Sequence, residues 1–125
     1  MREFVVELKQ RPGELTRVAS MLARHQVTLK AGAAMAVGTR LIARFVPSDI
    51  EAARRALDAA DIRFDEGEVV SVLLESRAGE LAMLSSRLAD GGVTVRAIYL
   101  TSTVGSLVEL AIVPDNPDRA KRVLE

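Results

Sequence analysis

The sequence predicts an α+β protein that contains the same small folding unit twice. A glycine-containing loop occurs twice, as QRPGEL at residues 10–15 and as SRAGEL at residues 76–81. Before each loop, apolar residues alternate with polar ones, which is the period of a half-buried strand. After each loop, apolar residues recur three and four positions apart, which is the period of an amphipathic helix. The length of 125 residues suits one ordinary domain or two very small ones.

The composition is that of a globular protein without a strong overall charge. Hydrophobic residues make up 49% of the chain and charged residues 27%, and 17 basic residues balance 17 acidic ones. This balance argues against nucleic acid or an anionic membrane as a partner. The chain has no cysteine, which rules out disulfides, thiolate metal sites and a cysteine nucleophile. No apolar run approaches the roughly 20 residues of a membrane span, and charges interrupt the first ten residues, unlike a secretory signal. We therefore expect a cytoplasmic protein.

The duplication extends well beyond the two loops. An offset of 66 residues superposes Gly13 on Gly79, and also superposes Glu14 on Glu80, Leu15 on Leu81, Leu22 on Leu88, Val27 on Val93 and Thr28 on Thr94. Farther along, the offset becomes 67, as shown by Gly38 and Gly105, Pro47 and Pro114, and Arg55 and Arg122. We infer that one residue has been inserted in the second copy, near its hairpin.

Each copy is predicted to have the order β-α-β-β-α. The first strands are marked by Phe4, Val6, Leu8 and by Val70, Val72, Leu74, and the first helices by Leu15, Val18, Leu22 and by Leu81, Leu84, Leu88. Two further strands are expected at 27–35 and 41–46 in the first copy, and at 93–100 and 107–113 in the second. Pro47 and Pro114 end these strands and precede the second helices.

A fourth strand is expected in the first copy only. Residues 62–64 have the alternation of a short strand, and residues 65–67 form a turn that ends in glycine. Right-handed crossovers make this βαββαβ order a ferredoxin-like sandwich of one sheet and two helices. The predicted organisation is therefore two ferredoxin-like units in tandem, at residues 1–67 and 68–125, the second without an obvious fourth strand within the chain. The edge left open in the second sheet invites pairing, either with residues 62–64 folded back onto 69–74 or with a second chain.

The segments VELKQRPGELTRVASMLARHQVTLKA and VLLESRAGELAMLSSRLADGGVTVRA resemble the ACT domain, the amino-acid-sensing module of metabolic enzymes and regulators. The family pattern is a strand, Asp or Asn, any residue, Pro-Gly, any residue, Leu, and an amphipathic helix that is followed by Gly-Val/Ile-Asn-Ile. The chain departs from it where Gln10 and Ser76 replace the acid or amide, Ala78 the proline, Gln26 the glycine, and Thr28 and Thr94 the asparagine. The resemblance covers the whole chain as two copies, and it implies a stand-alone tandem ACT protein.

The resemblance also implies where a ligand binds. In such families a free amino acid lies where two ACT units meet, between the loop before the first helix and the start of the second strand. On this sequence the implied binding residues are Gln10, Arg11, Gly13, Glu14, Leu15 and Thr28, and Ser76, Arg77, Gly79, Glu80, Leu81 and Thr94. Physical chemistry agrees, because a helix N-terminus attracts a carboxylate and glycine permits close approach of a ligand. Structural roles stay open for these residues: a tight turn for the glycines, the helix dipole for the glutamates, solvation for the arginines and strand propensity for the threonines.

No catalytic machinery can be assembled from the sequence. No nucleophile with a base is evident, His25 has a glycine as its counterpart, and the acidic residues of 58–68 fit no calcium loop. We therefore expect no enzyme activity, no metal and no cofactor. The predicted function is non-catalytic regulation through a bound amino acid, by a homodimer that passes the signal to a partner enzyme or regulator. The alternative is an interaction or dimerisation module that acts through the open sheet edge without a small ligand.

Overall fold

The computed structural model describes all residues from Met1 to Glu125, and they form two compact units. The N-terminal unit comprises Arg2–Gly67, and the C-terminal unit comprises Glu68–Glu125 together with Met1. Each unit is described by itself below. None of the helices has both the length and the hydropathy that are needed to cross a bilayer.

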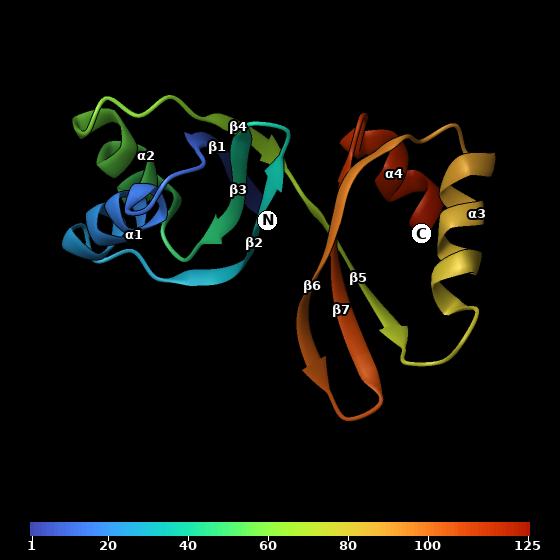
Figure 1. Cartoon of the computed structure of the whole chain (residues 1–125). Coiled ribbons are helices and arrows are strands. Elements are labelled where there is room, and N and C mark those ends of the chain that lie inside the picture. The colour runs from blue at the N-terminus through green and yellow to red at the C-terminus, as the bar shows by residue number, and fades with distance from the viewer. The chain divides into compact units, whose positions relative to one another are not determined.

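The N-terminal unit has the predicted βαββαβ order. Its sheet has the strand order β2-β3-β1-β4, and the two helices lie together on one side of it (Figure 1). The elements are β1 (Arg2–Lys9), α1 (Glu14–Arg24), β2 (Leu29–Val37), β3 (Arg40–Pro47), α2 (Ile50–Ala59) and β4 (Asp65–Glu68). The strand order places β1 and β3 in the middle of the sheet, and their alternate side chains therefore face the helices.

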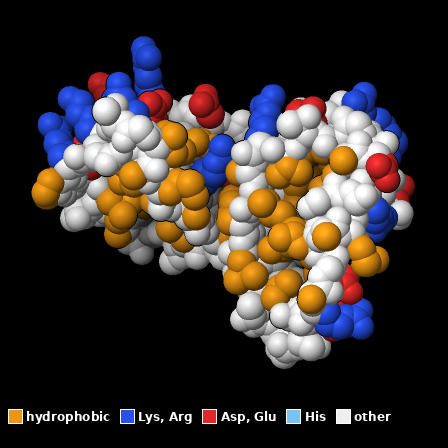
Figure 2. All heavy atoms as spheres, turned by 45° about the vertical axis from the view of Figure 1, so that its right-hand side comes forward, with side chains coloured by type: hydrophobic (Ala, Val, Ile, Leu, Met, Phe, Trp, Pro, Cys, Tyr) orange, Lys and Arg blue, Asp and Glu red, His pale blue; other side chains and the backbone are white.

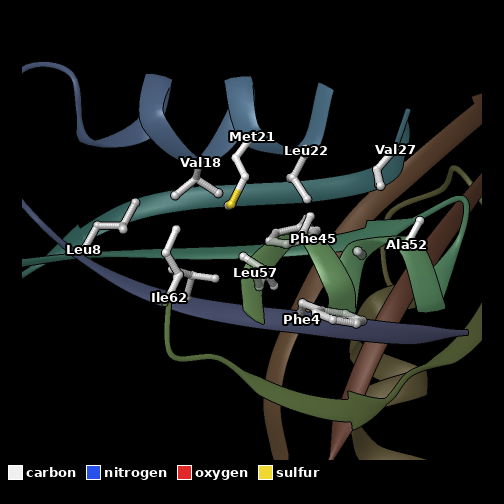
Figure 3. Packing of buried hydrophobic residues seen from close by; sticks show 13 residues of the cluster. Phe4, Leu8, Val18, Met21, Leu22, Val27, Phe45, Ala52, Leu57 and Ile62 are labelled. Atoms are coloured by element: carbon white, nitrogen blue, oxygen red, sulfur yellow. The ribbon is translucent and has the colours of Figure 1, made fainter. Parts of the chain in front are cut away.

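The core of the N-terminal unit lies between that sheet and its two helices (Figure 3). Phe4, Val6 and Leu8 project from β1 and are buried, as the alternation in the sequence predicts. The ring of Phe4 stacks on Phe45 with 5.7 Å between the centroids. The helices contribute the other buried members, which are Val18, Met21, Leu22, Ala52, Ala53, Ala56 and Leu57.

The C-terminal unit repeats this arrangement without a fourth strand. Its three-stranded sheet has the order β5-β7-β6, so that β5 is an edge strand. The elements are β5 (Val70–Glu75), α3 (Glu80–Asp90), β6 (Val95–Val104), β7 (Leu107–Pro114) and α4 (Pro117–Leu124). Leu84, Leu88, Val93, Ile112 and Ala120 are buried between the sheet and the helices. The predicted tandem of ferredoxin-like units, with the second one short of a strand, is confirmed.

The inserted residue of the second copy is visible as a bulge. Both hairpins shift register near the start of their first strand, between Leu29 and Ala31 in β2 and between Val95 and Ala97 in β6. Only β6 has a second shift, between Leu100 and Ser102. The extra residue is therefore Thr101, whose hydroxyl donates to Glu109 Oε1 at 2.6 Å. A bulge of this kind absorbs one residue without moving the rest of the ladder.

The prediction for the fourth strand of the N-terminal unit was wrong in its position. Residues 62–64 form no strand, and the expected turn at 65–67 lies within β4, which is a neighbour of β1. Residues 62–64 do not fold back onto β5 either. The physical reason is burial: Ile62 is only 8% exposed in the core, and Phe64 stacks on Phe4 at 5.3 Å. Because Ile62 and Phe64 are anchored in the core, the chain reaches the edge of the sheet only after Phe64. Strand pairing therefore begins at Asp65, the first residue of β4.

Ion pairs hold β4 in its place. Glu66 accepts hydrogen bonds from Arg54 Nη2 at 2.5 Å and from Arg2 Nε at 3.1 Å. The guanidinium of Arg54, followed by that of Arg2, lowers the pKa of the Glu66 carboxyl below its ordinary value. No local pattern in the sequence indicates this contact, because its partners lie on three different elements, β1, α2 and β4.

Gln26 should be replaceable by glycine with a gain in stability. Gln26 has a φ of 62°, in the left-handed region, and its counterpart Gly92 has a φ of 75°. A side chain costs roughly 1–2 kcal/mol there, and the greater freedom of glycine in the unfolded state offsets part of this. We expect Gln26→Gly to raise the free energy of unfolding by about 0.5–1 kcal/mol in urea denaturation.

The control for this change is the neighbouring residue. His25 has a φ of −96°, so His25→Gly removes no strain and is expected to destabilise the protein. Equal losses of stability in both variants would show that the left-handed conformation of Gln26 carries no cost.

Candidate functional site

Both glycine loops adopt the same conformation at the start of a helix. Gly13 and Gly79 precede α1 and α3 with φ values of 88° and 91°. A Cβ atom at either position would meet nothing within 4 Å. The positive φ values favour glycine at both turns. The open space beside each turn leaves room for a ligand, so these glycines are compatible with a structural role and with a binding role.

The two glycine loops leave their helix N-termini uncapped. Neither α1 nor α3 has a hydrogen bond from a capping side chain, because glycine occupies the N-cap position. The other two helices are capped: Ala52 N donates to Asp49 Oδ1 and Arg119 N donates to Asn116 Oδ1, each at 3.0 Å. The first N–H groups of a helix need an acceptor. At α1 and α3 the N–H groups of Glu14 and Glu80 donate to the carbonyl oxygens of Arg11 and Arg77 at 3.4 and 3.3 Å, and a bound carboxylate can accept from the N–H groups that follow.

In the first loop, several predicted binding residues are held by the protein itself. Glu14 is only 7% exposed, and its carboxylate lies 3.7 Å from Arg11 and 3.5 Å from Arg17 while it accepts from the N–H of Lys9. Gln10 Nε2 donates to the carbonyl oxygens of Gly38 at 2.6 Å and of Arg40 at 3.0 Å. Gln10 and Glu14 therefore close the loop onto the β2–β3 hairpin and the start of α1.

The second loop is more open. A pocket of about 340 Å³ lies beside it, near the lower end of the range for small-molecule sites. Arg77 Nη2 lies 2.8 Å from Glu80 Oε1, with 69% of the Arg77 side chain exposed. The lining combines loop residues with apolar strand residues, among them Ser76, Arg77, Glu80, Leu81, Leu74 and Leu110. An arginine, a helix N-terminus and an apolar floor thus lie around one hollow.

Sequence reasoning placed Leu15 and Leu81 correctly on the helices but did not anticipate their exposure. They are 49% and 53% exposed, whereas Val18 and Leu84, one turn later, are 3% exposed. Leu15 lines an apolar pocket of about 430 Å³ between α1 and β2, together with Val18, Leu22, Leu29 and Phe45. The two exposed leucines are therefore available to a ligand or to a neighbouring molecule.

Thr28 and Thr94 lie apart from the loop of their own unit. Gln10 bonds at the Arg40 end of β3, whereas Thr28 Oγ1 donates to Ser48 Oγ at 2.8 Å, just beyond the opposite end of that strand. Thr94 N likewise donates to Asp115 Oδ1 at 3.0 Å, just after β7. The structure therefore does not bring the loop and the threonine of one unit together. A ligand that contacts both kinds of residue must be shared between two units.

Val108 and Leu110, which line the pocket beside the second loop from β7, are not among the predicted binding residues. Their alternation in the sequence predicts a strand and nothing more. The pairing of Leu74 with Val108, which brings β7 under the loop, depends on the register of the sheet. That register is not readable from a short apolar run.

Comparison with known proteins supports the fold. No protein-family model matches the sequence, and no curated protein does. The chain is similar to the solved structure of protein BT0572 from Bacteroides thetaiotaomicron, with a TM-score of 0.87, 25% identity, and coverage of 98% of this chain and 85% of that one. It is also similar to the regulatory subunit of aspartate kinase from Thermus thermophilus, with a TM-score of 0.66, 16% identity, and coverage of 98% and 89%.

A third similar structure is that of aspartokinase alpha and beta subunits, with a TM-score of 0.67, 21% identity, and coverage of 98% of this chain and 88% of that chain. In each case nearly the whole chain is matched, so that the similarity includes both repeats. These matches agree with the element order and the glycine loops described above. The chain therefore has a tandem ACT-like fold, similar to that of the aspartate kinase regulatory subunit.

Proposed function

We propose that this chain is a non-catalytic regulatory protein that binds a free amino acid at its glycine loops. The observation that carries this proposal is the contrast between its helices: α2 and α4 are capped by their own side chains, whereas α1 and α3 begin at an open glycine turn. The uncapped N–H groups suit the α-carboxylate of the ligand. Arg77 adds a charge-assisted hydrogen bond, and Glu80 is placed near enough to accept from the α-ammonium group.

We assign the primary site to the second loop. Glu14 of the first loop is already engaged by Arg11, Arg17 and the N–H of Lys9, whereas Glu80 has Arg77 as its ion-pair partner and lines a pocket. A ligand has less to displace at the second loop. Gln10, Arg11, Gly13, Glu14 and Leu15 form the weaker site of the pair.

A homodimer completes the proposed site. Thr28 and Thr94 are separated from the loop of their own unit, so a ligand reaches them only where a second unit is apposed. The strands that follow these threonines, β2 and β6, are edge strands with exposed apolar side chains. Between 41% and 71% of the side chain is exposed in Leu29, Met35 and Val37 of β2 and in Ile98, Leu100 and Val104 of β6. Apolar surface of this extent marks an association site. Ligand binding then stabilises the dimer, and a partner enzyme or regulator in the cytoplasm responds to it.

A thermal-shift screen of the full chain against the free amino acids tests the proposal. A ligand at about 100 times its dissociation constant adds roughly 2.7 kcal/mol to the stability of the folded state, so one amino acid or a small related group should raise the melting temperature selectively. A flat screen, supported by calorimetric titrations without heat, would contradict the proposal.

Arg77→Gln should weaken binding of the selected amino acid by about tenfold or more, because a hydrogen bond between charged groups is worth about 1.5–3 kcal/mol. The matched variant Arg11→Gln probes the equivalent arginine of the first loop, and we expect a smaller loss. Arg24→Gln, in the last turn of α1, is the neutral control. Equal affinity in all three variants would remove the loops from the site.

A further inference from the structure

A basic hollow with a volume of about 340 Å³ lies between α1 and α2 of the N-terminal unit, and no strand residue lines it. The lining of this α1–α2 hollow consists of Arg17, Met21, Arg24 and His25 from α1 and its C-cap, and of Ala56, Ala59 and Ala60 from α2 and its C-cap. Met21 and Ala56 are buried and form the floor, whereas the three basic side chains are exposed. Figure 2 shows Lys and Arg side chains at the end of the N-terminal unit where Figure 1 places the two helices.

The basic groups of the α1–α2 hollow keep hydrogen-bond donors for a ligand. Arg24 makes no ion pair or side-chain hydrogen bond within the chain. Arg17 approaches Glu14 through Nε at 3.5 Å, which leaves both of its Nη groups available. His25 Nδ1 lies 3.1 Å from the carbonyl oxygen of Met21. Because that oxygen only accepts, Nδ1 carries the hydrogen and Nε2 stays available to a ligand. Two guanidinium groups and one imidazole therefore lie around one hollow.

The charges around the α1–α2 hollow favour an anion. No carboxylate lines it. Asp58 and Asp61, near the end of α2, line a different hollow that includes Glu7 of β1. The last carbonyl groups of each helix add a negative charge of only about half a unit, which the two guanidinium charges outweigh. The potential in the hollow is therefore positive.

The internal repeat shows that the fold itself does not require this hollow. By the repeat offsets, Arg17, Arg24, His25 and Ala56 correspond to Met83, Asp90, Gly91 and Val123 of the C-terminal unit. A Cβ atom added at Gly91 would clash with the side chain of Val123. Val123 therefore occupies, in the C-terminal unit, the space that Ala56 leaves open in the N-terminal one. The C-terminal unit has the same two helices without the three basic residues and without the space between them.

We propose that the α1–α2 hollow binds a phosphate dianion, either as free phosphate or as the phosphate group of a small metabolite. Guanidinium groups match phosphate oxygens with paired hydrogen bonds, and a dianion neutralises two guanidinium groups where a single carboxylate neutralises one. The volume accommodates a phosphate with a short organic part, and Met21 and Ala56 offer that part an apolar floor. The primary amino-acid site belongs to the C-terminal unit, so either proposal can fail without the other.

The test uses the imidazole of His25 as the probe. His25 is the only histidine of the chain, so its ring signals in NMR spectra report on the hollow without overlap. The full chain is titrated at fixed pH with sodium phosphate, and sodium chloride keeps the ionic strength constant. We expect saturable shifts of the His25 ring and of the backbone amides around Arg24, with a dissociation constant in the millimolar range or below.

Two further ligands define what the hollow recognises. Sodium acetate, a monoanion, should bind at least about tenfold more weakly than phosphate. Glycerol phosphate distinguishes the two sources of the dianion: tighter binding than phosphate would assign the hollow to a phosphorylated metabolite, and equal binding would assign it to phosphate itself. No saturable shift with either phosphate compound, or equal binding of acetate, would overturn the proposal.

Variants of the protein locate the site. Arg24→Gln removes a guanidinium group that has no partner within the chain, and it should weaken phosphate binding by at least about tenfold. Arg55→Gln is the matched control, because it removes the same charge from an exposed position of α2 that does not line the hollow. Arg24→Gln should leave the affinity for the amino acid unchanged, which separates the two proposals.

A second pair of variants adds a charge instead of removing one. Ala59→Glu places a carboxylate at the rim of the hollow and should abolish phosphate binding. Ala19→Glu adds the same charge to α1 at an exposed position outside the hollow, and it should change the affinity by no more than about twofold. Phosphate binding that survives in both Arg24→Gln and Ala59→Glu, or that falls equally in the controls, would overturn the proposal.

Discussion

Leu57→Ala is expected to destabilise the N-terminal unit by about 2–5 kcal/mol, the usual cost of a cavity in a packed core. Leu57 is 0% exposed and lies in one cluster with Phe4, Leu8 and Ile62. The cavity cannot collapse easily, because sheet and helix residues surround it. Residue-resolved hydrogen exchange measures the loss, and we expect it on α2 and its neighbours.

The repeat supplies the matched control for this substitution. Leu124 occupies the equivalent position of α4 but is half-buried, because no residue of the C-terminal unit covers it as Ile62 covers Leu57. We expect Leu124→Ala to cost about 1 kcal/mol or less. Similar costs for the two substitutions would show that Leu124 is covered in solution as completely as Leu57.

Gly32→Ala is expected to destabilise the N-terminal unit by about 1–3 kcal/mol. An added Cβ at Gly32 would lie 2.7 Å from the carbonyl oxygen of Arg44 and 3.3 Å from the Cα of Phe45. Both are backbone atoms of the neighbouring strand, so the contact is relieved only if β2 and β3 move apart. The measurement is the urea midpoint followed by circular dichroism.

The adjacent residue is the control for Gly32. Ala33→Val adds side-chain atoms at an exposed position of the same strand, where a β-branched residue favours the strand, and we expect little change. If Gly32→Ala is also neutral, β2 is free to move away from β3, and the apolar pocket between α1 and β2 is not a fixed feature of the unit.

Much of the fold was predictable because the repeat gave each periodicity twice. The strand Phe4-Val6-Leu8 and the helix that begins after Gly13 were placed to within a residue or two. The fourth strand was misplaced, because a glycine in 65–67 indicates a turn unless the contacts of Glu66 with Arg54 and Arg2 are known. Such contacts join residues far apart in the chain, and no local pattern encodes them.

The candidate site was predictable in part, and for a similar reason. The loop glycines were recognised from their repetition, and their positive φ values agree with a required turn. The side-chain role of Gln10 was not readable, since its partners are carbonyl groups of the β2–β3 hairpin. The separation of Thr28 from its own loop was likewise hidden, because it follows from the length and direction of α1 and β3.

The proposed function requires that the starts of α1 and α3 bind an amino acid. The most direct test is a ¹⁵N NMR titration of the full chain with the amino acid selected by the thermal-shift screen. We predict saturable shifts of the backbone amides of Gly79, Glu80 and Leu81, weaker shifts of Gly13, Glu14 and Leu15, and none at the capped starts of α2 and α4. Shifts that spare both glycine loops, or that affect all four helix starts alike, would show that the glycine loops do not bind the amino acid.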